Sequence, residues 1–358
     1  MIFAYEKKYY KNISQQIMQI FNNWNVVAKG WYIACPSSAL PKRKAKSVEI
    51  CSQKIAIFRG EDGQARALDA YCPHLGTDLG IGQVDGNWIR CAFHHWAFDE
   101  TGNCQNIPCQ SEIPAPAKLQ AYATEEKYGF IWIYPDAVAP ERVADFDELK
   151  GKEIVTQADT AFERSCHHHI CMMNGIDAQH LKTIHHLDIK MDLSLHQSEL
   201  GTQIDFIMRG NFPQSTFRER LGQRFLGSTY EYSMRYAHGC IGLLTMMKNV
   251  RLFPPLHMLY AYTAIAPGRT RIQPIYVTEK RKGIGGYLLS KFLLLCTRLA
   301  YYMLRDEDGK IYDNIRFHPK LLLSIDTPLA QYMKYVNQLE PSRWSQSVKK
   351  ATIEHEIL

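Results

Sequence analysis

Two pairs of metal-binding side chains, each made of one cysteine and one histidine, constrain this chain more than any other feature. The first pair is Cys72 and His74, and the second is Cys91 and His94, with sixteen residues between the pairs. Each pair lies at a turn between short β-like runs, so two loops must face each other for the four side chains to meet. Such a set can hold either a tetrahedral zinc ion or an iron–sulfur cluster.

The order of the ligands separates these two kinds of centre. Zinc fingers pair cysteine with cysteine and histidine with histidine along the sequence. Here the pattern is Cys-x-His and then Cys-x-x-His, followed by Trp96, and it resembles the Rieske proteins over residues 24–135. The resemblance implies a [2Fe–2S] cluster with both thiolates on one iron and both imidazoles on the other. Such ligands raise the reduction potential to roughly −150 to +300 mV. A zinc site is the alternative.

Four other residues of these loops indicate which branch of the Rieske proteins the chain resembles. Rieske proteins of respiratory and photosynthetic complexes carry an extra cysteine in each loop, where this chain has Thr77 and Phe93. The resemblance is therefore to the oxygenase and ferredoxin branch. Leu75 stands where an arginine is common, and His95 stands where oxygenases usually have glycine. Neither difference removes a ligand.

A second group of candidate metal ligands follows some eighty to ninety residues after the cluster motif. His180 and His185 lie five residues apart in a stretch, 174–186, that is predicted to be helical, with Asp177 one turn before His180 on the same face. The two imidazoles can converge on one ion if the helix ends or opens near His185. Two histidines and one carboxylate form the facial triad of non-haem Fe(II) oxygenases. Alone the pattern is weak, because helical histidines are commonly packed or solvated.

After a Rieske motif, however, the spacing Asn174-x-x-Asp177-x-x-His180-x4-His185 resembles the signature of Rieske oxygenases. The resemblance implies that His180 and His185 bind iron, and it selects His185 over the adjacent His186. It also implies a homotrimer in which Asp177 bridges a cluster histidine of one subunit and an iron histidine of its neighbour. Asn174 is expected near the iron.

The third iron ligand is expected far downstream, in the acidic run 304–316. This run resembles the C-terminal segment of the branch that includes ketosteroid hydroxylases and pheophorbide oxygenases, and the resemblance places the ligand at Asp308. Asp306 is the fallback. An ordinary charged helix face is the alternative that the residues themselves leave open.

The chain of 358 residues is long enough for two domains. Short β-like runs dominate its first third, whereas five strand-like runs between 202 and 278 precede long helical patterns at 284–314 and 327–337. We predict an α+β fold with an N-terminal all-β Rieske domain and a C-terminal helix-grip domain, an antiparallel sheet around long helices. The predicted parts are an N-terminal helix (1–24), the Rieske domain (25–135), a linker (136–150), the catalytic domain (151–345) and a tail (346–358).

The charge pattern argues against a nucleic-acid partner. The net charge of +6 is modest, and lysines and arginines are scattered rather than gathered as in a nucleic-acid groove.

Charges at the N-terminus stand where a signal peptide needs its apolar core, so we predict a cytoplasmic protein. The segment 280–304 is basic and then apolar. It is interpreted either as a core helix that lines the substrate cavity or as a peripheral membrane surface that admits a lipophilic substrate.

Three consecutive histidines, His167, His168 and His169, follow Cys166. Consecutive side chains of a regular element point in different directions, so we do not expect all three to bind one ion. We interpret them as a polar run that leads into the iron-binding stretch.

Together the two sites predict a terminal oxygenase. The resemblance implies that a flavin reductase or a ferredoxin delivers NAD(P)H electrons to the [2Fe–2S] cluster and then to a mononuclear Fe(II). With O2, the enzyme would hydroxylate, demethylate or desaturate a bulky hydrophobic molecule. The alternatives are an aromatic-ring cis-dihydroxylating dioxygenase and a Rieske electron-transfer or redox-sensing protein without oxygenase activity.

Overall fold

The computed structural model describes residues 20–185, 193–211, 220, 223–224, 227–251 and 253–345. Within these residues the chain forms two compact units. One comprises 29–144 and 342–345, and the other comprises 20–28 and 145–341. Residues 1–19 of the predicted N-terminal helix and the predicted tail lie outside the described residues, and residues 20–24 form turns. The predicted domain bounds stay predictions.

The unit that contains the cluster motif is built from three small antiparallel sheets. Their strand orders are β1-β11-β10, β2-β3-β4-β9 and β5-β6-β7-β8. The strands are β1 (Tyr32–Pro36), β2 (Lys44–Ile50), β3 (Gln53–Arg59), β4 (Ala65–Asp69), β5 (Gln83–Asp85), β6 (Trp88–Arg90), β7 (Ala97–Phe98), β8 (Cys104–Asn106), β9 (Ala121–Tyr122), β10 (Thr124–Lys127) and β11 (Phe130–Ile133). Short 3-10 turns are η1 (Ser37–Ala39) and η2 (Leu79–Ile81).

The sheets β2-β3-β4-β9 and β5-β6-β7-β8 contribute to one small core that reaches the two motif cysteines. Phe58, Leu68, Ile89 and Phe98 are fully buried there. Cys72 and Cys91 belong to the same cluster of buried side chains, so the base of each motif loop is anchored in the core. A rigid base of this kind holds the metal-binding side chains in place.

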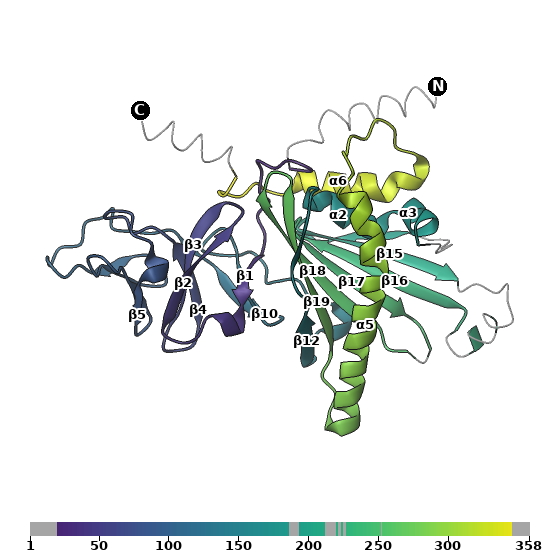
Figure 1. The fold of residues 1–358 in the computed structure, drawn as a ribbon, viewed down its shortest axis with the longest axis horizontal. Coiled ribbons are helices and arrows are strands. Elements are labelled where there is room, and N and C mark those ends of the chain that lie inside the picture. Colours follow the sequence, from purple (N-terminus) through teal and green to yellow (C-terminus); the bar gives the residue numbers. More distant parts are fainter. Residues whose placement is uncertain are drawn as a thin grey trace. The chain divides into compact units, whose positions relative to one another are not determined.

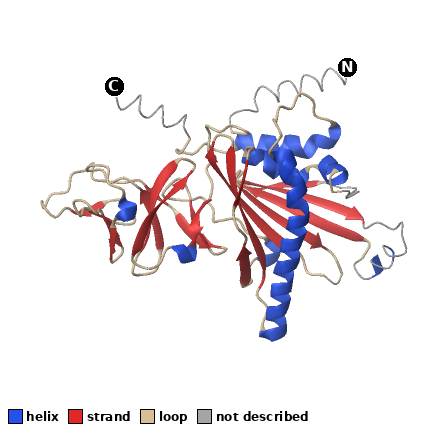
Figure 2. Cartoon of the chain, in the orientation of Figure 1, coloured by secondary structure: helices blue, strands red, loops and turns tan. Residues whose placement is uncertain are grey.

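The second unit is dominated by one antiparallel sheet, with the strand order β12-β19-β18-β17-β16-β15-β14 and with β13 also paired to β19 (Figures 1 and 2). Its strands are β12 (Ile154–Ala158), β13 (Phe162–Arg164), β14 (Ser194–Gln197), β15 (Gln203–Asn211), β16 (Thr229–Ala237), β17 (Ile241–Lys248), β18 (Leu256–Ala266) and β19 (Arg269–Glu279). The helices are α2 (His168–Met173), α3 (Ala178–Thr183), α5 (Gly283–Tyr312) and α6 (Thr327–Gln338), with 3-10 turns η3 (Asp147–Leu149), η4 (Asn174–Ile176) and η5 (Ser324–Asp326).

The long helix α5 runs beside the strands and contacts β18 and β19 (Figure 1). Its inward face follows helical spacing, with Leu294, Thr297, Tyr301 and Asp308 three, four and seven residues apart. Leu294 and Thr297 are buried against the sheet, which aligns the later turns of the helix with the same face. This face therefore brings Asp308 to the interior of the unit.

The predicted α+β fold is confirmed. The five strand-like runs are β15 to β19, and the two helical patterns are α5 and α6. The stretch predicted to be helical over 174–186 forms η4 and α3, but Asp177 interrupts it, so a single continuous helix is wrong. Asp177 lies between η4 and α3 and caps α3, so it is not one turn before His180 within a helix. Aspartate is a preferred capping residue, since its carboxylate accepts the free N–H groups of the first turn.

Candidate active site

The two motif loops have the same backbone hydrogen bonds. The N–H of Cys72 donates to the carbonyl of Thr77 at 2.9 Å, and the N–H of Cys91 donates to the carbonyl of Trp96 at 2.9 Å. Each bond closes a loop from a cysteine to the residue five positions later. Two equivalent loops therefore present their side chains from equivalent frameworks.

In each loop, the residue four positions after the cysteine makes a second hydrogen bond. The N–H of Gly76 donates to the carbonyl oxygen of Cys72, and the N–H of His95 donates to the carbonyl oxygen of Cys91. Gly76 has a φ of +75° and His95 a φ of +58°. The turn therefore requires the left-handed backbone conformation, which explains why glycine suits this position and why histidine there is under strain.

The four motif side chains meet across the two loops. Cys72 and Cys91 are buried at the base, His74 is exposed and His94 is half-buried. The rings of His74 and His94 lie 4.5 Å apart, and His74 stacks on Trp96 at 4.8 Å. Burial raises the pKa of the Cys72 thiol to about 11. The thiolate that a cluster needs is therefore formed when metal displaces the proton.

Three further side chains converge in the other unit. His180 is on α3, His185 lies two residues beyond its end, and Asp308 is on α5. Their facing atoms form a small triangle, with Nε2 of His180 2.9 Å from Nε2 of His185 and 2.9 Å from Oδ1 of Asp308. The third side, from Nε2 of His185 to Oδ1 of Asp308, is 3.0 Å. The helix ends before His185, which is what allows both imidazoles to face one point.

The donor set fits a metal ion. Oδ1 of Asp308 is buried and has no hydrogen-bond partner among the described residues, although two ring nitrogens lie within 3.0 Å of it. A buried carboxylate oxygen that faces two imidazoles without bonding to either is explained by a cation between them. Two histidines and one carboxylate are the ligands that mononuclear non-haem iron prefers.

The comparisons with known proteins indicate the family of the chain. Residues 30–122 match the family model of the Rieske [2Fe–2S] domain. The chain is 26% identical to cholesterol 7-desaturase nvd of Hemicentrotus pulcherrimus, across 87% of this chain and 70% of the relative. It is also 27% identical to the oxygenase component of 3-ketosteroid-9-alpha-monooxygenase of Rhodococcus rhodochrous, across 57% of this chain and 55% of the relative. The chain belongs to the Rieske non-haem iron oxygenases.

Other matches bear on fold and coverage. The crystal structure of dicamba monooxygenase bound to 3,6-dichlorosalicylic acid is similar with a TM-score of 0.61 and 18% identity, across 88% of this chain and 98% of that chain. Cholesterol 7-desaturase nvd of Bombyx mori is 34% identical, but the match spans 46% of this chain and 37% of the relative. As a Rieske oxygenase, the chain takes a [2Fe–2S] cluster and a mononuclear iron, so the predicted cofactors are confirmed.

Around the candidate iron site of this Rieske oxygenase, one partner was missed by sequence reasoning. Oε2 of Glu307 lies 3.0 Å from Nδ1 of His185. A carboxylate at this position holds the ring proton on Nδ1 and leaves the lone pair of Nε2 toward the ion. Glu307 directly precedes Asp308 in the sequence, so the acidic pair itself was the available signal. The side chains of Asp306, the fallback ligand, and of His186 lie outside the described residues.

Asn174 and Asp177 have distinct contacts in the same region. Nδ2 of Asn174 donates to Oδ2 of Asp308 at 2.9 Å and lies 3.0 Å from Nε2 of His180. Asn174 is thus beside the candidate iron ligands His180 and Asp308, as expected. Oδ1 of Asp177 accepts a hydrogen bond from the backbone N–H of His180 at 3.1 Å, which fixes the start of α3.

The three consecutive histidines contradict their sequence interpretation. The rings of His167, His168 and His169 are buried and lie 4.1 to 4.5 Å apart, so they converge rather than diverge. His167 precedes α2 with an extended ψ of 140°, which breaks the regular helix geometry. Nδ1 of His167 and Nδ1 of His169 accept backbone N–H groups, from His169 and Asn22. Neutral rings of this kind carry their protons on Nε2, so the arrangement does not favour a metal ion.

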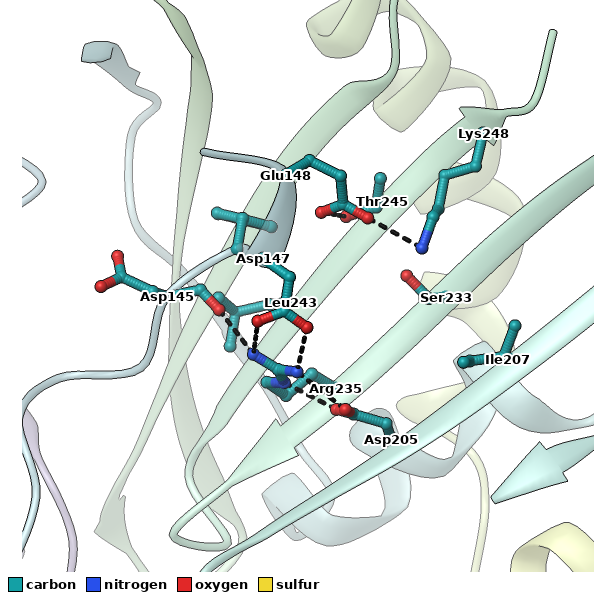
Figure 3. Close-up of a pocket in the computed structure, with 11 residues that line it drawn as sticks. Asp145, Asp147, Glu148, Asp205, Ile207, Ser233, Arg235, Leu243, Thr245 and Lys248 are labelled. Atoms are coloured by element: carbon teal, nitrogen blue, oxygen red, sulfur yellow. Dashed lines mark hydrogen bonds and ion pairs between the residues drawn. The ribbon is translucent and has the colours of Figure 1, made fainter. Parts of the chain in front are cut away.

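A pocket of about 50 Å³ lies elsewhere in the unit, between η3 and strands β15 to β17 (Figure 3). Its charged side chains pair with one another: Arg235 bonds Asp147 at 2.7 Å and Asp205 at 2.6 Å, and Lys248 bonds Glu148 at 2.8 Å. These ion pairs attach η3 to the sheet. The pocket is therefore best explained as part of the scaffold.

Proposed function

We propose that this chain is the terminal oxygenase of a system in which an NAD(P)H reductase, directly or through a ferredoxin, supplies the electrons. The reaction is the hydroxylation, demethylation or desaturation of a bulky apolar molecule of the sterol class with O2. The observation that carries the proposal is the convergence of His180, His185 and Asp308 in a chain that also holds the cluster loops. A simple Rieske electron carrier would not need this second site.

In this proposal the chain positions the reactants. His180, His185 and Asp308 would hold the iron on one side and leave its other positions open. When bound, the iron supplies the oxidising chemistry, with electrons delivered through the cluster. Asn174 donates to Oδ2 of Asp308, which leaves Oδ1 directed at the ion, and Glu307 orients the ring of His185.

The surroundings of Asp308 support an apolar substrate. Tyr260 of β18 and Tyr301 of α5 contact each other, with ring centroids 5.8 Å apart, and Phe162 and Leu244 pack beside them. Large aromatic walls exclude water and bind flat apolar ring systems. The relatives named cholesterol 7-desaturase and 3-ketosteroid-9-alpha-monooxygenase support the sterol class in particular.

Cis-dihydroxylation of an aromatic ring is the second candidate reaction. The two reactions differ in the fate of O2, since a monooxygenase places one of its atoms in the product and a dioxygenase places two. Mass spectrometry of a product made under ¹⁸O2 separates them. Desaturation would place neither atom in the product.

We also propose a homotrimer in which electrons pass between neighbouring subunits. His74 is exposed beside Leu75 and Phe93, which are 65% and 60% exposed, so the cluster loops present an apolar rim that a neighbour can cover. Asp177 would be the bridge between a cluster histidine and His180 of different subunits. Sedimentation equilibrium tests the assembly, and a single subunit mass at micromolar concentration would contradict it.

Peripheral membrane binding is the third part of the proposal. The structure has one helix, among those it describes, that is long and apolar enough to span a membrane, namely α5, and only 22% of its most apolar window is buried. Its exposed large side chains recur three or four residues apart, at Ile284, Leu288, Phe292, Leu295 and Leu299. The exposed cations Lys280, Lys282 and Lys291 lie at or near its N-terminal end. An apolar stripe with flanking cations favours the surface of an anionic bilayer.

The deciding experiment is electron paramagnetic resonance of the anaerobically reduced, Fe(II)-supplied protein after addition of nitric oxide. We expect a high-spin iron–nitrosyl signal beside the reduced Rieske signal. Asp308→Ala should lose the first signal and keep the second. A Rieske signal alone in the wild-type protein would instead support the electron-carrier alternative.

A further inference from the structure

One buried hydroxyl near the iron site has no partner, although its neighbours do. Tyr301 is 5% exposed, and its hydroxyl makes no hydrogen bond among the described residues. The adjacent hydroxyls of Tyr276 and Tyr302 both donate to Oδ2 of Asp159, at 2.9 and 2.5 Å. Natural proteins rarely leave a buried hydroxyl unpaired, so this one requires an explanation.

The position of Tyr301 connects it to the iron ligands. Tyr301 precedes Asp308 by seven residues on the inward face of α5, which is two helical turns or about 10 Å along the axis. Tyr260 of β18 interacts with both: its ring contacts Tyr301, and the charge of Asp308 adds to the burial that raises the pKa of Tyr260. The side chain with the unpaired hydroxyl and the candidate ligand Asp308 thus both interact with Tyr260.

We propose that the hydroxyl of Tyr301 binds a hydroxyl or carbonyl oxygen of the substrate, at the end of the molecule remote from the carbon that is oxidised. The inference rests on the proposed oxygenase function and defines its substrate class further, as a rigid apolar skeleton with a terminal oxygen. A site built to bond such an oxygen rejects analogues that lack it, because the buried hydroxyl is then left unpaired.

The first test uses the free protein and needs no substrate. Tyr301→Phe removes a hydroxyl that bonds nothing, so the melting temperature should stay the same or rise. Tyr302→Phe is the matched control, because it removes a hydrogen bond to Asp159 and should lower the melting temperature by several degrees. If Tyr301→Phe lowers it as much as Tyr302→Phe does, the hydroxyl has a partner within the protein and the proposal is rejected.

The second test measures binding with defined probes. Cholesterol and its 3-deoxy analogue cholest-5-ene are titrated into the iron–nitrosyl protein, and the change of the nitrosyl signal reports binding. The wild-type protein should bind cholesterol at least about tenfold more tightly, and Tyr301→Phe should abolish that difference by weakening cholesterol alone. Equal affinity for both probes in the wild-type protein would reject the role of Tyr301 and leave the oxygenase function intact. If neither probe perturbs the signal, the sterol class and this role fail together.

Discussion

Gly76 and His95 occupy the same position in the two cluster loops, and both have a positive φ angle. Each is the fourth residue after a cluster cysteine and donates its N–H back to that cysteine. Glycine adopts this conformation without strain, whereas a side chain there costs about 1 to 2 kcal/mol. The second loop is therefore the more strained of the two.

Replacing His95 should reveal this strain. His95→Gly should raise the melting temperature by a few degrees and keep the full cluster content, because the backbone conformation becomes free of strain. His95→Val should lower both the melting temperature and the cluster content, since a β-branched residue is strongly disfavoured at positive φ. Thermal melting and the absorbance and EPR of the reduced cluster measure these effects. An unstable His95→Gly protein would instead indicate that the imidazole makes a required contact.

Removal of Glu307 should weaken iron binding. Its carboxylate orients His185, and partners of this kind typically contribute tenfold to a hundredfold in metal affinity. Because Glu307 is exposed to solvent, we expect Glu307→Gln to lower Fe(II) affinity by about tenfold, near the lower end of that range. Titration of Fe(II) against the iron–nitrosyl signal measures it. The exposed Glu199→Gln is the charge-matched control, and equal affinities of the two variants would contradict the role.

The exposed stripe of α5 should bind anionic vesicles. The wild-type protein is expected to co-sediment with phosphatidylserine vesicles at low salt, and less at high salt, because screening weakens the contribution of the lysines. The double variant Leu288→Asn with Phe292→Asn should lose most of the binding at an unchanged melting temperature, since both side chains are exposed. If the wild-type protein does not bind these vesicles at low salt, the membrane proposal is contradicted and a protein partner for the exposed stripe is favoured.

His257 should make the protein sensitive to mild acid. Burial lowers the pKa of His257 to about 4, an effect that Glu148 opposes and that Lys152, Lys248 and Arg281 reinforce. An unfolded histidine has a pKa near 6.5, so between about pH 6.5 and 4 the unfolded chain binds a proton that the folded chain does not. The free energy of unfolding therefore falls as the pH falls through this window, by up to about 1.4 kcal/mol per pH unit.

The corresponding measurement is the melting temperature at pH 7.5 and at pH 5. His257→Gln cannot take up the proton, so its melting temperature should fall less than that of the wild-type protein. His196→Gln, at an exposed position, is the control. Identical falls in all three proteins would show that His257 does not govern the acid response.

The features that could be predicted from the sequence are those with a local pattern. Alternating apolar residues indicated β15 to β19, and helical spacing indicated α5. When one face of a strand or helix is buried, its apolar residues recur at the period of that element. The candidate metal-binding residues were predicted from their spacing. His180 and His185 carry a short-range pattern, whereas Asp308 depended on resemblance, since nothing local distinguishes it from its acidic neighbours.

What escaped prediction depends on backbone conformation and on contacts between distant segments. The strain at His95 is visible only as a φ angle. The convergence of His167 with the two histidines after it arises because His167 lies outside the helix, which a regular period cannot describe. The unpaired hydroxyl of Tyr301 is likewise invisible in sequence, because its neighbours on β18 and β19 come from other parts of the chain.

The proposed iron ligands come from two segments that are far apart in sequence. His185 and Asp308 are separated by 123 positions, and the second lies on the longest helix of the described structure. An ion held by both would act as a removable cross-link that closes a long loop and holds α3 against α5. Loading with iron should then slow proteolysis around α3. The resistance of this segment to proteolysis would therefore report whether iron is bound.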